Sequence, residues 1–157
     1  MSNLKERILF IVAHPDDDIL GSGGTIAKLS KKGSIIHVVF LTDGETSRDN
    51  ILDPNKLIHK RKNNAKKALK ILGCNSTDFL NYQDQRLDSL EFLDIVKNIE
   101  KIIKSFKPDK IFTHYENDLN LDHQITCRAV VTASRPKSGS YINELIFFEI
   151  PSSTNWN

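Results

Sequence analysis

Four side chains that can bind a metal ion or move a proton stand close together near the start of the chain. His14 and the consecutive acids Asp16, Asp17 and Asp18 directly follow the apolar run 8–12. Burying adjacent carboxylates costs several kcal/mol unless a cation or a metal ion pairs with them. Zinc hydrolases take three nitrogen or oxygen ligands from the protein and leave one position for water. We therefore expect one divalent metal ion per chain here, with zinc preferred and other divalent metals still open.

The residue types leave the roles within this cluster open. His14 and either Asp16 or Asp17 can supply two ligands from one tight turn, and the remaining acid would then act as general base on the activated water. His123, at a predicted junction between a loop and a helix, is the best candidate for a third ligand. His114 ends a predicted strand and is equally well explained as a site residue or as a structural one.

Apolar patterning predicts the elements that position these residues. Continuous Ile- and Val-rich runs indicate buried strands, and apolar residues that recur every three or four positions indicate helices. Strands are expected at 7–13, 34–41, 77–80, 110–114 and 144–150, and helices at 25–32, 55–72, 92–106 and 122–134. Strands that alternate with helices predict a mainly parallel sheet, which binds ligands outside the carboxyl ends of its strands. Four polar clusters should therefore converge there, at 14–18, 42–45, 81–84 and 114–123.

Two other patterns have structural interpretations that involve no catalytic chemistry. Gly21–Gly24 does not fit the GxGxxG fingerprint of dinucleotide binding, and the acids before it would repel a pyrophosphate. We expect these glycines to let a helix pack closely against the sheet. The basic residues of the helix predicted at 55–72 are interpreted as a solvated face, with Arg61 as the member that could bind an anion.

Length and composition limit the class of protein. A chain of 157 residues supports one domain, and a formal net charge of +2 argues against a dedicated nucleic-acid-binding protein. The first apolar run is too short for a signal peptide or a membrane span, so we expect no membrane span and a cytoplasmic location. Cys74 and Cys127 show no metal-binding spacing and are expected to be buried free thiols.

Two motifs resemble those of a known family. The stretch from Ala13 to Asp18, read as AHPDDD, resembles the AHPDDE signature of the LmbE-like, PIG-L-type N-acetylglucosaminyl deacetylases. The stretch from Asn120 to His123, read as NLDH, resembles their second signature, HxDH. The order of the intervening features fits as well, and the similarity covers nearly the whole chain.

The resemblance implies roles for individual residues. His14, Asp17 and His123 correspond to zinc ligands, and Asp16 corresponds to the general base. The remaining assignments are substrate binding by Arg61 and Asp84, orientation of a neighbour by Asp122, and stabilisation of the oxyanion by Asn120 or by a loop donor such as Tyr115.

The sequence departs from the family pattern at several points. Asp18 stands where Glu is usual, so a shorter side chain would have to support the site. Asn120 replaces the first histidine of HxDH and can donate a hydrogen bond, but it carries no positive charge. Asn64 replaces an acid that often follows Arg61 by three positions. The chain is also shorter than typical members, which leaves open whether its C-terminal part is truncated.

Together these observations predict one three-layer, Rossmann-like α/β domain over 1–157, with a mainly parallel sheet flanked by helices. The predicted function is zinc-dependent removal of an N-acetyl group from an amino sugar or glycoconjugate. Two alternatives stay open: a sugar-nucleotide-binding α/β module that holds Mg²⁺, and a truncated form that binds metal without activity. An exposed pair of Phe147 and Phe148 on the last strand could favour a homo-oligomer.

Overall fold

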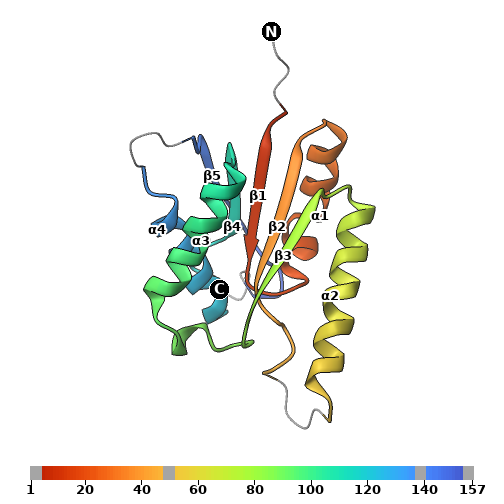
Figure 1. Cartoon of the computed structure of the whole chain (residues 1–157), viewed down its shortest axis with the longest axis vertical. Helices are drawn as coiled ribbons and strands as arrows, with labels where there is room; N and C mark the ends of the chain where they lie inside the picture. Colours follow the sequence, from red (N-terminus) through yellow and green to blue (C-terminus); the bar gives the residue numbers. More distant parts are fainter. Residues whose placement is uncertain (1–4, 48–51, 137–140, 154–157) are drawn as a thin grey trace.

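The computed structural model describes residues 5–47, 52–136 and 141–153. These residues form one five-stranded sheet in which all neighbouring strands are parallel, in the order β3-β2-β1-β4-β5 (Figure 1). The strands are β1 Arg7–Val12, β2 Ile35–Thr42, β3 Ser76–Tyr82, β4 Lys110–His114 and β5 Glu144–Phe148. The parallel α/β sheet that the sequence predicts is thereby confirmed.

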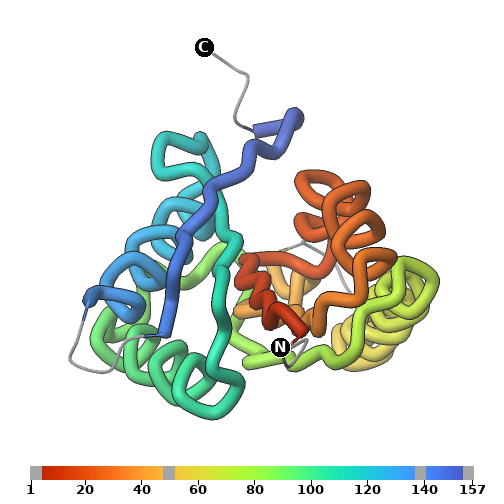
Figure 2. Tube along the Cα trace, turned by 90° about the horizontal axis from the view of Figure 1, so that it is seen from above, coloured from red at the N-terminus to blue at the C-terminus, as the bar shows by residue number. Residues whose placement is uncertain are grey.

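Four helices cover the two faces of this sheet. Figure 2 shows α1 and α2 on one face and α3 and α4 on the other. The helices are α1 Asp17–Lys31, α2 Pro54–Ile71, α3 Phe92–Phe106 and α4 Leu121–Ala133, with a 3₁₀ turn η1 at Leu87–Ser89. Local sequence explains two of the helix starts. The Asp53 side chain accepts from the backbone N–H of Lys56 at the start of α2, and Asn120 caps α4 in the same way.

Strand β1 lies in the middle of the sheet and divides the apolar core in two. Leu9 and Ile11 belong to the core beneath α3 and α4, and Phe10 and Val12 belong to the core beneath α1 and α2. All four side chains are fully buried. Because the end of β1 is held by packing on both sides, the residues that follow it start from a fixed position.

Helix α1 differs from its prediction. It begins at Asp17 and not near residue 25, so Gly21, Gly23 and Gly24 lie inside it. Because glycine has a low helix propensity, the sequence did not predict a helix here. The helix nevertheless begins at Asp17, since acids in a first turn are favoured by the positive end of the helix dipole. The predicted close approach does exist at Gly21, where an added Cβ would clash with the ring of Phe148 on β5.

The surface features meet the sequence expectations in part. Phe147 is exposed, whereas Phe148 is buried against Gly21 and the ring of His114, so the predicted exposed pair is reduced to one residue. Cys127 is buried and Cys74 is partly buried, and both are free thiols. Within the described ranges, no helix is both long and apolar enough to cross a membrane.

Candidate metal centre and active site

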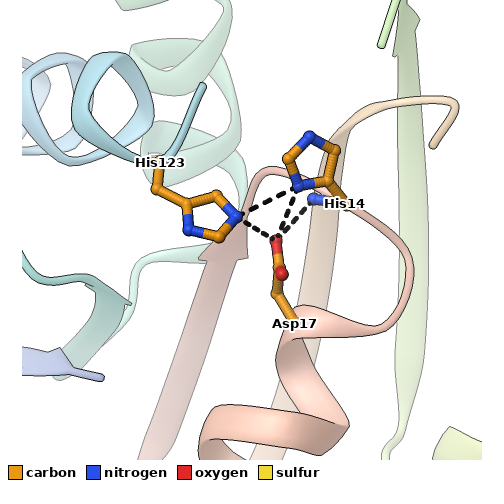
Figure 3. Close-up of side chains that lie close together, drawn as sticks. All are labelled: His14, Asp17 and His123. Atoms are coloured by element: carbon orange, nitrogen blue, oxygen red, sulfur yellow. Dashed lines mark hydrogen bonds and ion pairs between the residues drawn. The ribbon is translucent and has the colours of Figure 1, made fainter. Parts of the chain in front are cut away.

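The predicted site residues gather at the carboxyl ends of β1 and β4. From β1 the chain continues to β2 and β3 on one side of the sheet, and β4 leads to β5 on the other side. This is the topological switch point at which open α/β sheets bind ligands. His14 follows β1, Asp17 opens α1, and His123 lies in the first turn of α4 (Figure 3).

Three ligand atoms from these residues face one another. Nδ1 of His14 lies 3.1 Å from Nε2 of His123, and Oδ2 of Asp17 lies 3.2 Å and 3.3 Å from these two nitrogens. Ligand atoms that surround a zinc ion tetrahedrally at its usual bond lengths are about 3.3 Å apart. The donor types and their spacing therefore fit a metal ion with two imidazoles and one carboxylate, as the sequence predicts.

The outer nitrogen of each imidazole meets carboxylates. Nε2 of His14 lies 3.1 Å from Oδ1 of Asp84 and 3.3 Å from Oδ2 of Asp122. Nδ1 of His123 lies 3.2 Å from Oδ2 of Asp118. Histidines that ligate metals usually donate their other N–H to such a group, which fixes the tautomer and the ring orientation. Both rings are therefore held with one nitrogen directed toward Asp17.

The buried charges in the cluster shift each other's pKa. Burial alone would lower the pKa of His14, but the carboxylates of Asp122, Asp17 and Asp84 raise it to about 12. Burial would raise the pKa of Asp17, but its close contacts with the imidazoles of His114, His123 and His14 hold it well below its usual range. The site thus favours positive charge beside a carboxylate that stays ionised, which is the electrostatic environment that a cation needs.

Asp16, the predicted general base, lies at the mouth of the site. Half of its side chain is exposed, and its Oδ2 is 3.1 Å from Nη1 of Arg61. Arg61 also donates through Nε to Oε1 of Glu45. The backbone of Gly44 packs against Arg61, since an added Cβ would lie 3.0 Å from its Cδ. Arg61, predicted to bind substrate, therefore also orients Asp16.

The NLDH motif at 120–123 supplies the cap of helix α4 as well as a candidate metal ligand. The side-chain oxygen of Asn120 accepts from the backbone N–H groups of Asp122 and His123. Asp122 does not cap the helix, and its carboxylate accepts from the backbone N–H groups of Gln85 and Leu87. This carboxylate also contacts His14, as described above, so His14 is the neighbour that Asp122 is placed to orient, and the orienting role stays a prediction.

Two predicted residues are placed differently. Tyr115 does not line the recess beside the cluster, and its hydroxyl accepts from Nδ2 of Asn117 at 3.2 Å. Asp18 is fully buried, and within the described chain neither of its carboxylate oxygens has a hydrogen-bond partner. Burial raises the pKa of Asp18 to about 7. Its supporting role stays a prediction.

Sequence reasoning missed or left open several neighbours of the cluster. Asp118 was missed, although its position in the loop before Asn120 and His123 could have indicated it. His114 was left open, and its Nε2 accepts from the backbone N–H of Ala13 at 2.9 Å. The His114 ring also stacks on that of His123, with a centroid distance of 3.9 Å. His114 thus joins the end of β1 to the start of α4.

A recess of about 360 Å³ opens beside these residues. Its walls include the three candidate ligands, Asp16 and Arg61, with Asn120 and Asp84 also contributing. Its volume is in the range of small-molecule sites. A parallel α/β sheet with a histidine–carboxylate metal centre beside such a recess defines a candidate metal-dependent enzyme.

Comparison with known proteins identifies the family. Residues 9–134 match the model of the GlcNAc-PI de-N-acetylase (PIG-L) family, so the chain belongs to this family. The uncharacterized deacetylase YaiS of Escherichia coli K12 is 34% identical over 97% of this chain and 78% of its own length. A probable N-acetyl-α-D-glucosaminyl L-malate deacetylase 2 of Bacillus cereus is 30% identical over 83% of this chain and 61% of its own length. The family match and these relatives support an N-deacetylase, a hydrolase of amide bonds.

Solved structures agree on the fold. N,N'-diacetylchitobiose deacetylase from Pyrococcus horikoshii aligns with a TM-score of 0.72 and 30% identity, over 82% of this chain and 49% of that chain. The hydratase GalB from Pseudomonas putida aligns with a TM-score of 0.74 but 24% identity, over 90% of this chain and 62% of that chain. Since a hydratase shares the fold, the reaction has to be argued from the residues of the site.

Proposed function

We propose that this chain is a zinc-dependent N-deacetylase that releases acetate from an N-acetylated amino sugar or glycoconjugate. The observation that carries the proposal is the triangle formed by His14, Asp17 and His123, whose ligand atoms lie 3.1 to 3.3 Å apart. Two imidazoles and one carboxylate favour zinc over Mg²⁺, which prefers oxygen ligands. The names of the relatives support the substrate class, since they include deacetylases of glucosaminyl malate and of diacetylchitobiose.

The chain's own residues divide the chemistry among them. Zinc held by His14, Asp17 and His123 would lower the pKa of a bound water and polarise the acetamide carbonyl. The carboxylate of Asp16 would accept a proton from the attacking water and return it to the leaving nitrogen, so that one carboxylate serves as base and then as acid. Arg61, 3.1 Å from Asp16, keeps this carboxylate at the mouth of the recess.

Oxyanion stabilisation is assigned to the amide of Asn120 together with the metal. The Asn120 oxygen is engaged by two helix N–H groups, so the NH₂ group of the same amide is the part that can donate to substrate. Tyr115 is not assigned this role, because it does not line the recess. A cytoplasmic location and a homo-oligomer stay predictions.

The test combines metal analysis with an assay of acetate release. The protein is dialysed and its zinc content measured, and acetate release from N-acetylglucosamine derivatives is then followed for the wild type, Asp16→Asn and His123→Ala. We expect about one zinc per chain in the wild type and in Asp16→Asn, a large loss of zinc in His123→Ala, and activity in the wild type alone.

Three other outcomes would each support a different conclusion about the function. Equal acetate release by the wild type and Asp16→Asn would refute the mechanism. Stoichiometric zinc without acetate release from any derivative would favour the inactive metal-binding form. Binding of Mg²⁺ together with a sugar nucleotide, in place of zinc, would favour the nucleotide-binding module.

A further inference from the structure

Helix α2 carries positive charge along its whole length. Its sequence, PNKLIHKRKNNAKKALKI, contains seven lysine and arginine residues and no aspartate or glutamate. Figure 1 shows the N-terminal half of α2 extending past the carboxyl ends of the central strands, on the side where the candidate site lies. Arg61, from this half of the helix, lines the recess of the candidate site.

Arg61 is not the cation that is free to meet an anionic ligand. Its Nε donates to Glu45 and its Nη1 contacts Asp16 at 3.1 Å. Burial alone would lower the pKa of Arg61, but the hydrogen bond to Glu45 and the charge of Asp16 raise it. The guanidinium charge is already balanced by two carboxylates of the protein.

Lys60, the residue before Arg61, is differently placed. It is exposed, and within the described residues no ion pair includes it. It lines a second recess of about 350 Å³, together with Leu57 and Asn64, which lie on the same side of α2 at spacings of three and four residues. Pro15 and the Arg61–Glu45 pair complete the walls. Since Arg61 is already paired with Glu45 and Asp16, Lys60 is the cation of this recess that remains available to a ligand.

The two recesses are neighbours, because Arg61 lines both of them. A ligand whose acetamide lies at the metal centre could pass the Arg61 side chain and place a second group beside Lys60. Leu57 and Pro15 offer apolar contact to the carbon skeleton of such a group. The Lys60 ammonium and the Asn64 amide offer hydrogen-bond donors to its oxygens.

We propose that this second recess, through Lys60 and Asn64, binds an anionic group of the substrate, either a carboxylate or a phosphate attached to the amino sugar. The inference rests on the proposed function, since it names the substrate class of the same site. Its new content is that the recess lined by Lys60 and Asn64 holds the anionic group and that Lys60 selects substrates that carry one.

The test compares one anionic and one neutral substrate. The probes are N-acetylglucosamine 1-phosphate and methyl N-acetylglucosaminide, assayed with the metal-loaded full chain. Lys60→Met removes the charge and keeps most of the stem, Lys60→Arg keeps the charge, and Lys67→Met removes an exposed charge of α2 that does not line the recess. Lys60→Met should lower kcat/KM for the phosphate about tenfold, chiefly through KM, and leave the neutral substrate unchanged. Lys60→Arg and Lys67→Met should stay within about twofold of the wild type on both.

A binding measurement separates this inference from the proposed function. Titration calorimetry with glucosamine 1-phosphate and with methyl glucosaminide, which lacks the phosphate, needs no turnover, so Lys60-dependent binding of the phosphate would support the recess even if the wild type released no acetate. The inference is overturned if the wild type shows no preference for the phosphate. It is equally overturned if Lys60→Met weakens both ligands alike, or if Lys67→Met matches the effect of Lys60→Met.

Discussion

Oδ2 of Asp118 lies 3.2 Å from Nδ1 of His123, and this contact leaves Nε2 of the same ring to face Asp17 and His14. The same carboxylate oxygen accepts from the hydroxyl of Ser153 at 3.0 Å. Asp118 is almost fully buried, so its charge acts on the ring at short range and with little screening by solvent. A residue outside the two sequence signatures thus sets the orientation of a candidate ligand.

The first prediction concerns this contact. Asp118→Asn keeps the shape of the side chain but removes the negative charge that accepts from the imidazole, so zinc affinity should fall about ten- to a hundredfold. A competitive chelator titration measures the change. Ser153→Ala removes another contact of the same oxygen, together with a longer contact of 3.5 Å to Nδ1 of His123, and should change affinity less than about threefold. Equal losses in the two variants would show that the carboxylate does not act through His123.

The second prediction separates two roles of Asp84. The sequence assigns it to the substrate, whereas its Oδ1 lies 3.1 Å from Nε2 of His14 and its Oδ2 accepts from Ser47. If Asp84 acts mainly on His14, Asp84→Asn should lower zinc affinity about tenfold and leave KM at saturating zinc within about twofold. A raised KM with unchanged zinc affinity would restore the substrate-binding role. Chelator titration and initial-rate kinetics on the same preparation decide between them.

The third prediction concerns the backbone beneath Arg61. Gly44 has φ +69°, and an added Cβ would lie 2.7 Å from Cδ of Pro15 and 3.0 Å from Cδ of Arg61. Gly44→Ala should therefore cost about 1 to 2 kcal/mol of stability and displace Arg61 from Asp16, which lowers acetate release. Urea denaturation and the acetate assay measure both effects.

Gly24 provides the matched control for Gly44. It lies inside α1, and an added Cβ would meet nothing within 4 Å. Gly24→Ala should therefore stabilise the protein by roughly 0.5 to 1 kcal/mol, because alanine favours the helix, and it should leave activity unchanged. A Gly44→Ala variant as stable and active as the Gly24→Ala variant would contradict the proposed link between Gly44 and Arg61.

The sequence predicts those elements whose residues share one period. Strand β4 occupies 110–114 and α3 occupies 92–106, as the apolar patterns indicate, because β4 is a short run buried on both faces and α3 buries one continuous apolar face. The start of α1 was missed because glycines and acids carry little periodic signal. The helix is stabilised there by its dipole and by packing of Gly21 against Phe148, which comes from the far end of the chain.

The candidate site likewise contains residues that the local sequence predicts and contacts that depend on the tertiary fold. The sequence predicts three candidate ligands, His14, Asp17 and His123, because their residue types and motifs are typical of metal sites. Asp118 could have been found from its place in the loop just before His123, whereas the pairing of Arg61 with Glu45 could not, since it depends on how α2 packs against the loop after β2. Such contacts between distant segments have no local sequence pattern from which they could be read.

The last prediction concerns His37, which lies near the amino-terminal ends of the strands, opposite the candidate site. His37 on β2 is buried, with Nδ1 2.7 Å from Oγ of Ser76 and Nε2 3.3 Å from Oδ2 of Asp78. Arg7 and Lys101 line the same recess. Burial lowers the pKa of His37 below its usual 6.5, and this outweighs the opposing effect of Asp78. Below about pH 6.5 the unfolded chain therefore binds a proton at His37 that the folded chain does not, and stability falls as the pH falls.

Replacing His37 should flatten this part of the pH dependence. The free energy of unfolding, measured with urea at about pH 7.5 and about pH 5.5, should differ less between the two pH values in His37→Gln than in the wild type. Asp78→Asn should have the opposite effect, because loss of the carboxylate lowers the pKa of the folded-state His37 further and enlarges the difference. If His37→Gln keeps the full difference, or if Asp78→Asn reduces it, protonation of His37 does not contribute to acid destabilisation of this fold.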